Sequence, residues 1–179
     1  MLRHLLALWV PLSLFAAAPT GLKIVSTTID PQTRSVIVKA QNMTDKTIVG
    51  HLVMYHTFDT ANHEITPPEG AGILDDYNVG PQNPTRFGFI GPGQIGTIQG
   101  YAAGRNIVSV KAEVVTVIFE DDTTEGEQAG AHAAFSTRRD RGKEAREQAA
   151  QEPAGSVKKA ELERRAAWFE AHSPKEANQ

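Results

Sequence analysis

The segment IVSVKAEVVTVIF, residues 107–119, constrains the fold more than any other part of the chain. Up to position 114 apolar residues alternate with polar ones, which is typical of a strand in a sheet with one solvent-facing side. In the last five residues, VTVIF, the alternation stops and both faces become apolar. We therefore expect another element to cover the outer face of this strand end, at Val115, Val117 and Phe119.

Three further segments have strand patterns. Residues 22–29 are rich in β-branched side chains and end at the turn sequence Asp30-Pro31-Gln32, after which residues 35–42 alternate. Proline presets the backbone of a turn, so these two segments are predicted to form a hairpin. Residues 48–58 are apolar at positions of both parities, which predicts a central strand largely covered on both sides. Together the patterns predict a mainly β sandwich over residues 20–127.

Between residues 59 and 106 the composition shifts to nine Gly and five Pro around short apolar fragments. So long a span without secondary structure is uncommon in a compact domain, so we expect short edge strands, most clearly over residues 97–102. Aromatic residues are interleaved with these glycines and prolines: Tyr77, Phe87, Phe89 and Tyr101. Aromatic side chains on loops can anchor an interface, whereas on edge strands they can plug the core. The sequence leaves both roles open.

The chain changes character again after residue 127. Alanine and charged residues dominate, which predicts a helical extension over residues 128–172, broken into two helices near residues 153–155. Ser156 is a suitable N-cap for the second helix. That helix carries an apolar stripe at helical spacing, formed by Leu162, Ala166, Trp168 and Phe169. The stripe is expected to pack on the sandwich or on a partner, and residues 173–179 are expected to be a disordered tail.

The amino terminus has the composition of a secretory signal peptide. Arg3 gives a short basic start, residues 5–15 are an apolar run, and Ala16-Ala17-Ala18 is a small-residue exit. The alternative is a membrane anchor, but the apolar stretch is shorter than the roughly 20 residues that span a bilayer, and it contains Pro11. We expect residues 1–18 to act as a signal peptide that is cleaved, with Ala16, Ala17, Ala18 and Thr20 as alternative last residues. We expect no stable transmembrane span afterwards, and a secreted or periplasmic location.

Composition excludes several classes of site. The chain has no cysteine, so it has no disulfide, thiolate metal site or catalytic cysteine. Residues 20–125 contain 7 Lys and Arg against 12 Asp and Glu, and the remainder is near neutral. Nucleic-acid binding requires a basic face, so nucleic acid is not an expected partner.

Two short strings resemble a known group of sequences. The corner NMTDKTI at residues 42–48 and the strand end VIFEDDT at residues 117–123 are similar to stretches in uncharacterised exported bacterial proteins with an immunoglobulin-like or fibronectin-like β-sandwich. The resemblance implies an immunoglobulin-like antiparallel β-sandwich, here with a helical C-terminal extension, and it implies no activity. Asp122 departs from the pattern, which has Gly there, and Asp tolerates a positive φ less well than Gly.

Metal-ligating residues occur in two sets. His51 and His56 differ by five positions, so on a regular strand they point to opposite faces, whereas His56 and His63 can meet across a loop. The acidic candidates for a Ca²⁺ site are Asp75, Asp76, Asp121 and Asp122, although their spacing matches no helix-loop-helix calcium loop. The simpler interpretation is that the histidines are surface residues or hydrogen-bonded strand residues, and that the acidic residues belong to a solvated turn.

No catalytic constellation is present in the sequence. It has no nucleophile elbow, no glycine-rich phosphate loop and no cofactor motif. The leading hypothesis is therefore a non-enzymatic exported module that binds another protein or an envelope component. A small-ligand or Ca²⁺-binding protein that uses the acidic loops is the alternative, and a hydrolase is a third possibility. The candidate interaction residues are the four aromatic residues above together with Leu162, Trp168 and Phe169.

Overall fold

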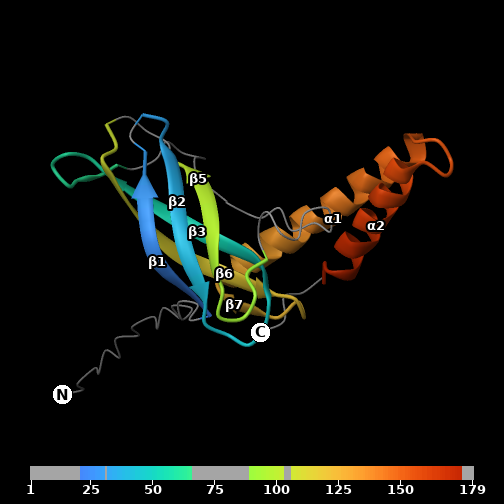
Figure 1. Cartoon of the computed structure of the whole chain (residues 1–179), viewed down its shortest axis with the longest axis horizontal. Helices are drawn as coiled ribbons and strands as arrows, with labels where there is room; N and C mark the ends of the chain where they lie inside the picture. The colour runs from blue at the N-terminus through green and yellow to red at the C-terminus, as the bar shows by residue number, and fades with distance from the viewer. Residues whose placement is uncertain (1–20, 31, 66–88, 103–105, 175–179) are drawn as a thin grey trace, which may run out of the picture.

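Seven strands and two helices make up the computed structural model, which describes residues 21–30, 32–65, 89–102 and 106–174 (Figure 1). The strands are β1 (Leu22–Ile29), β2 (Ser35–Asn42), β3 (Ile48–Phe58), β4 (Glu64–Ile65), β5 (Ile95–Tyr101), β6 (Ser109–Phe119) and β7 (Thr124–Gly126). The helices are α1 (Gln128–Gln151) and α2 (Val157–Ala171). The predicted signal peptide and most of the predicted tail, residues 175–179, lie outside the described residues.

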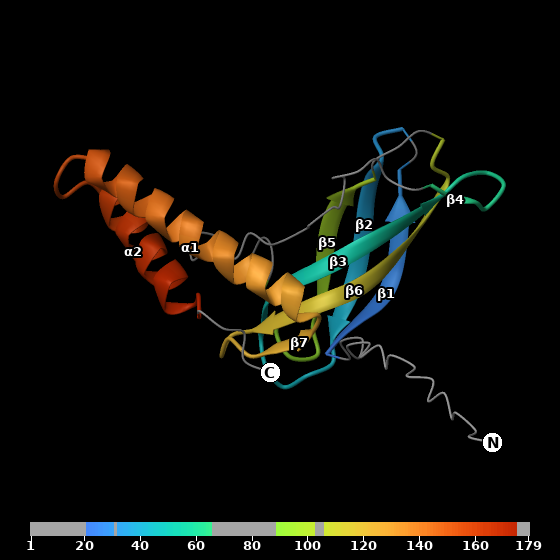
Figure 2. The same ribbon diagram turned by 180° about the vertical axis from the view of Figure 1, so that it is seen from behind.

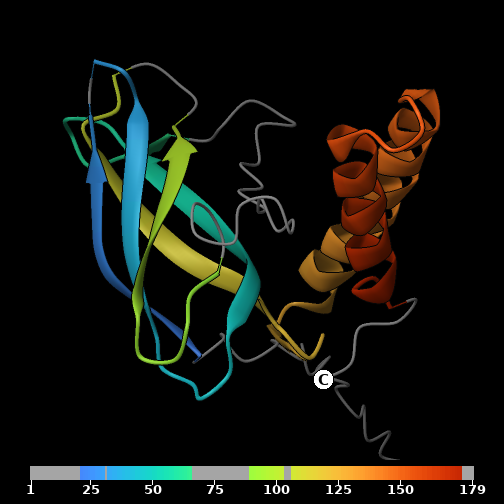
Figure 3. The same ribbon diagram turned by 45° about the vertical axis from the view of Figure 1, so that its right-hand side comes forward.

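The strands form two antiparallel sheets, ordered β1-β2-β5 and β4-β3-β6-β7. Figure 3 shows β1, β2 and β5 in one layer, with β3 and β6 crossing behind them. Apolar residues from both sheets are buried together in one main core, among them Val36, Val38, Val53 and Val114. The prediction of a mainly β, sandwich-like fold with two C-terminal helices is confirmed.

The predicted hairpin of β1 and β2 is present, with Asp30 at its tip. The Asp30 carboxylate accepts hydrogen bonds from the Gln32 backbone N–H at 2.9 Å and from the Thr33 hydroxyl at 2.8 Å. The hydrogen bond from the Thr33 side chain, with those from the turn backbone, lowers the pKa of Asp30. The local turn chemistry thus sets the register of β1 and β2.

Strand β3 is central, between β4 and β6, but it is covered on both faces only in its first half. Ile48 and Val49 are both buried, whereas Met54 is 48% exposed. The covering residues of α1 pack with Val49 and do not extend to Met54. The predicted edge strand at residues 97–102 is present as β5, which begins two residues earlier and ends one residue earlier.

The end of β6 is apolar on both faces, as predicted, but the prediction assigned the wrong residues to the outer face. The register of β3 and β6 shifts between Leu52 and Val53, because Leu52 pairs with Thr116 and Val53 pairs with Val114. Val115 is the extra residue of this bulge, and a bulge reverses the parity of the residues that follow it. Val117 and Phe119 therefore lie in the main core, and Thr116 and Ile118 lie on the outer face.

Helix α1 covers that outer face. Its first two turns bury Ala131, Ala134 and Phe135 against Val49 and Ile118 in a second apolar cluster. Gly130 makes the close approach possible, because a Cβ atom there would overlap the Thr116 hydroxyl and lie 3.0 Å from Leu52 Cδ2. Figure 2 shows α1 beginning over β3 and β6 and then running away from the sheets.

The apolar stripe of α2 packs mainly along α1, an arrangement that the sequence did not predict, and Trp168 also packs against the second apolar cluster on the sandwich. The break between the helices contains Gly155 at a φ of +78°, and the Ser156 hydroxyl accepts a hydrogen bond from the Lys159 N–H at 3.1 Å, as a cap does. Gly142 allows the two helices to approach, since its added Cβ would lie 3.2 Å from Phe169 Cβ. The helices therefore form a hairpin that projects from the sandwich (Figure 1).

Candidate functional site

The outer face of the β1-β2-β5 sheet carries exposed apolar side chains that no described helix covers. Three of its side chains belong to the exposed large hydrophobic residues of the protein: Ile37 (37% exposed), Ile95 (57%) and Tyr101 (47%). Cross-strand register places Ile37 beside Gln99, with Thr97 and Ile95 further along β5. The face is mixed, because polar residues lie between these side chains and the strands add the charges of Lys23 and Lys39.

Tyr101, a predicted interaction residue, lies at the end of β5 on this face. It pairs with Ser35 across the sheet, and the Arg34 guanidinium lies 4.9 Å from the centre of its ring. The arginine face can attract the ring electron density and holds the ring in one orientation. An oriented, half-exposed tyrosine is a common anchor of protein interfaces.

The other predicted aromatic anchors lie elsewhere. Phe89 is partly buried and packs against the second apolar cluster, which lies between the sheet and α1, so it has a packing role. Tyr77 and Phe87 lie outside the described residues, as do the acidic candidates Asp75 and Asp76. Within the described part, Tyr101 alone of the four aromatic candidates is exposed.

The three helical candidates pack within the chain. Leu162 and Phe169 are 5% and 1% exposed and form the buried face of α2. Trp168 touches the edge of Phe169 at 5.5 Å between ring centres and stacks on His172 at 4.5 Å. The predicted stripe is thus used mainly inside the helical hairpin.

Asp121 joins the two strings that carry the family resemblance. Its carboxylate lies 2.6 Å from Lys46 Nζ, and the Thr123 hydroxyl donates to it at 2.5 Å. The hydrogen bond from Lys46 is the main reason that the pKa of Asp121 falls to about 2. In the same contact the Glu120 N–H donates to the Thr47 carbonyl at 2.9 Å. The corner and the strand end therefore form one structural unit that ties β3 to the β6–β7 turn.

Asp122 forms the junction between the sandwich and the helical hairpin. Its carboxylate lies 3.4 Å from Arg138 Nη1 on α1 and 3.2 Å from His172 Nδ1 at the end of α2. Arg138 is 3% exposed, donates to the His172 carbonyl at 2.8 Å, and lies 5.3 Å from the ring centres of both Phe135 and Trp168. A buried guanidinium with a carboxylate partner fixes the two helices to one turn of the sandwich.

Sequence analysis did not identify Arg138. A signal for it exists, because Arg138 continues the spacing of Ala131, Ala134 and Phe135 along the buried face of α1. A charged residue inside such a stripe indicates a buried partner. The identity of that partner, a turn residue 16 positions earlier, depends on tertiary structure.

The described histidines do not converge. His51 and His56 face opposite sides of β3, as predicted, and burial lowers the pKa of His51 to about 4. His56 Nδ1 lies 2.7 Å from Glu64, and that hydrogen bond raises the pKa of His56. His63 lies 3.7 Å from Asp59. Among the described residues no three His, Asp or Glu side chains are placed to hold one metal ion.

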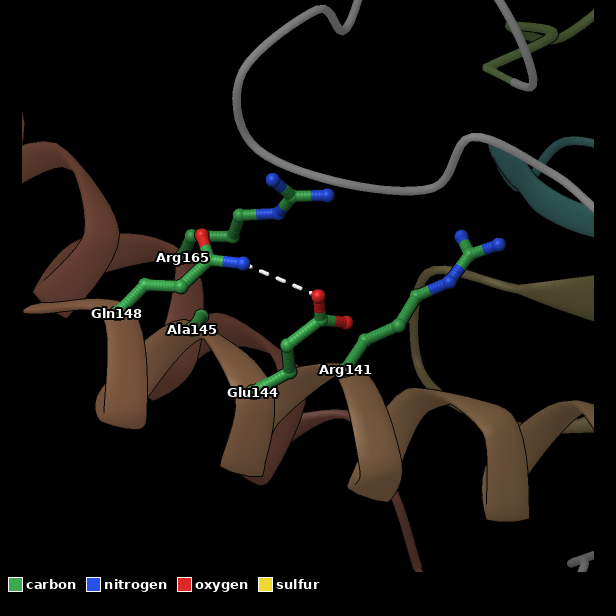
Figure 4. A pocket seen from close by; sticks show the side chains of 5 residues that line it. All are labelled: Arg141, Glu144, Ala145, Gln148 and Arg165. Carbon is green, nitrogen blue, oxygen red and sulfur yellow. Dashed lines mark hydrogen bonds between the residues drawn. The ribbon is translucent and has the colours of Figure 1, made fainter.

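A shallow groove of about 60 Å³ lies on the helical hairpin (Figure 4). It is lined by Arg141, Glu144, Ala145, Gln148 and Arg165, and Gln148 donates to Glu144 at 3.0 Å. Ligand pockets usually enclose several hundred Å³ and are mostly apolar. This groove is too small and too polar for such a site, and its lining contains no nucleophile.

Comparison with known proteins found no family model and no curated protein that matches the chain. Neither described helix combines the length and the apolar character that crossing a membrane requires. The candidate site therefore depends on geometry alone, and the face with Ile37, Ile95 and Tyr101 is the best supported one.

Proposed function

We propose that the protein is an exported, non-enzymatic module of immunoglobulin-like topology that binds another protein of the cell envelope through the outer face of its β1-β2-β5 sheet. The strand order supports the finer fold assignment. Immunoglobulin-like and fibronectin-like sandwiches place their first, second and fifth strands in one sheet, and their third and sixth strands side by side in the other. The order here is the same.

One observation carries the binding proposal: a helix covers one outer face of the sandwich, and no described helix covers the other. Helix α1 closes the apolar outer face of β3 and β6 with Ala131, Ala134 and Phe135. On the opposite sheet Ile37, Ile95 and Tyr101 stay exposed, and no described helix covers them. A face with few charges and with isolated apolar and aromatic side chains suits a protein partner, since interface cores are depleted in charge and enriched in aromatic residues.

The proposed location in the envelope is supported by the sequence. The leader-like residues 1–18 favour export, and the absence of cysteine means that the exported chain depends on its core and its polar junctions for stability. No described group of side chains has the arrangement of a general base with a nucleophile, which is why a binding role is preferred to catalysis.

A site-specific photo-crosslinking experiment tests the proposal. A photoreactive amino acid replaces Ile37 in one variant and Met54 in a control, because both are exposed apolar strand residues but lie on opposite sheets. In envelope extract, the Ile37 variant is expected to crosslink to one discrete protein that the Met54 variant does not reach. Identical adducts at both positions, or none at Ile37, would contradict the proposal.

A further inference from the structure

The edge of β5 lacks the protection that the other sheet edges have. Natural sheets blunt their edges with short strands, charged residues, proline or bulges, because a bare edge pairs with other chains. β1 carries Lys23 and a bulge between Ile24 and Ser26, while β4 and β7 are two and three residues long. β5 has seven residues, IGTIQGY, with no charge, no proline and no register shift.

One hydrogen bond shows which backbone N–H and C=O groups of β5 point toward β2 and which point away from it. The Ala102 N–H donates to the Arg34 carbonyl at 2.9 Å, on the line of the β2–β5 register. Backbone groups alternate in direction along an antiparallel strand, so the even-numbered residues of β5 bond to β2. The N–H and C=O groups of Ile95, Thr97, Gln99 and Tyr101 therefore point away from β2. Among the described residues no strand pairs with that side of β5.

We propose that β5 pairs with β5 of a second copy of the chain, antiparallel across a twofold axis at Ile98. This register sets Thr97 opposite Gln99 of the other copy and Ile95 opposite Tyr101 of the other copy. All four outward-pointing residues then occupy hydrogen-bonded positions, which no other twofold register of this strand achieves. The two copies then share one continuous sheet, β1-β2-β5-β5-β2-β1. The outward side of β5 is paired in both copies, so a third copy cannot add through the same contact.

The side chains of β5 suit this pairing because the strand is nearly palindromic about Ile98. Glycines occupy the symmetric positions 96 and 100, and the β-branched Ile95 meets the aromatic Tyr101, a favourable cross-strand pair. In a twofold interface a charged residue near the axis lies close to the same residue of the other copy, which repels it. β5 carries no charged residue, so this repulsion does not arise. These features favour a second copy over a partner strand of different sequence.

Sedimentation of the purified chain over a concentration series tests the oligomeric state. The expected result is a monomer–dimer equilibrium with nothing larger than a dimer. Thr97→Pro removes an outward N–H and no bond to β2, so it is expected to weaken the dimer roughly ten- to hundredfold, since two hydrogen bonds are lost across the axis. A wild-type chain that stays monomeric, or forms open-ended aggregates, would overturn the proposal.

A pair of charge variants tests the register of β5 against β5 of the other copy. This test does not require that β5 stay folded with a proline in it. In T97K/Q99K the axis at Ile98 sets lysine opposite lysine, and the dimer is expected to be lost. In T97K/Q99E it sets lysine opposite glutamate, and the dimer is expected to return. Melting curves of the monomers verify folding, and two double variants with equal affinity would rule out this register.

Self-association through β5 goes beyond the proposed function and does not require it. The dimer uses the backbone edge of β5 and the partner site uses the face around Ile37, and the two share Ile95 and Tyr101. The experiments still give separate answers, because sedimentation is measured on the purified chain alone, whereas crosslinking identifies the protein that is captured. A chain that crosslinks at Ile37 but remains monomeric would remove the dimer and leave the partner site. A dimer without a crosslinked protein would do the reverse.

Discussion

At the scale of the residue, Asp122 combines an unusual backbone conformation with a contact to the helices. Its φ of 61° lies in the left-handed region, which costs a non-glycine residue about 1 kcal/mol. The carboxylate offsets that cost because it contacts Arg138 on α1 and His172 at the end of α2. The side chain of this turn residue is therefore used to hold the helical hairpin.

Asp122→Asn is expected to lower the free energy of unfolding by about 1 to 3 kcal/mol, because asparagine tolerates the same φ but removes the carboxylate charge that lies 3.4 Å from the buried Arg138. Urea unfolding measures the change. Asp121→Asn is the matched control, since the Asp121–Lys46 pair is exposed (46% and 42%) and exposed pairs contribute up to about 1 kcal/mol. Equal losses in both variants would show that Arg138 does not depend on Asp122.

Because His51 is buried, we expect the stability of the protein to fall at acid pH. The folded protein holds its pKa near 4 through burial, below the ordinary value of 6.5. Below pH 6.5 the unfolded chain takes up a proton that the folded chain does not, so stability is fully present above pH 6.5 and falls on acidification toward pH 4. The slope is about 1.4 kcal/mol per pH unit, or roughly 2 to 3 kcal/mol between pH 6.5 and 4.5.

His51→Leu is expected to flatten that decline, as denaturant melts from pH 7 to 4.5 would measure. His56→Gln is the control: the pKa of His56 is raised, so its stabilisation is present below pH 6.5 and lost as the pH rises through the folded value. The control should keep the acid decline. A wild-type stability that is flat over this range would mean that His51 becomes charged without unfolding.

At the scale of the element, the contact of α1 with the outer sheet depends on Gly130. Alanine normally stabilises a helix interior by about 1 kcal/mol over glycine. Here Gly130→Ala is expected to destabilise by about 1 to 3 kcal/mol, since the new methyl group overlaps Thr116, which is 1% exposed and bonded to the Glu127 carbonyl.

The double variant G130A/T116A tests the cause. Removing the hydroxyl and methyl groups of Thr116 makes room for the new methyl group, so the two changes are expected to be non-additive by at least about 0.5 kcal/mol. Thermal unfolding of the four proteins in the cycle provides the measurement. Strict additivity, or a stabilised Gly130→Ala variant, would show that α1 does not lie this close to β6.

The strands and helices also show which features of the fold could be predicted from the sequence. The hairpin of β1 and β2, the break at residues 153–155 and the Ser156 cap were predictable because turn and cap chemistry is local. The apolar end of β6 correctly predicted a cover. Which residues faced that cover was not predictable, because the bulge at Val115 adds one residue and inverts the parity of Val117 and Phe119.

The candidate site was harder to predict for a physical reason. Ile37 and Ile95 lie 58 positions apart, and only the register of β2 and β5 places them on the same face of one sheet. Their exposure also depends on which sheet α1 covers, and α1 has only a narrow stripe of small residues to indicate that it covers anything. Tyr101 was a candidate because it is one of the aromatic residues interleaved with glycine and proline, and its role in binding stays a prediction.

At the scale of the whole molecule, the helical hairpin has two parts with different roles. The first turns of α1 close the sandwich, while most of the remainder of α1 and of α2 pack on each other (Figure 2). At the end of α2, Trp168 packs against the second apolar cluster and His172 contacts Asp122. Arg146 and Glu170 add an exposed ion pair between the helices. Stability should therefore depend on where the chain is shortened more than on how many residues are removed.

Two truncations separate these roles. A chain without residues 153–179 loses α2 but keeps the cover of Val49 and Ile118, which are 4% and 2% exposed. A chain without residues 128–179 exposes both, and its sandwich is expected to lose a further 3 to 6 kcal/mol or so, at about 1.5 to 3 kcal/mol for each large apolar side chain. Urea unfolding measures the stability, and binding of a dye that fluoresces on apolar surfaces reports the exposure. The shorter chain should bind more dye per molecule in its folded state. Equal stability and equal dye binding in the two truncated chains would show that α1 does not seal the sheet and that the two helices act only as an arm.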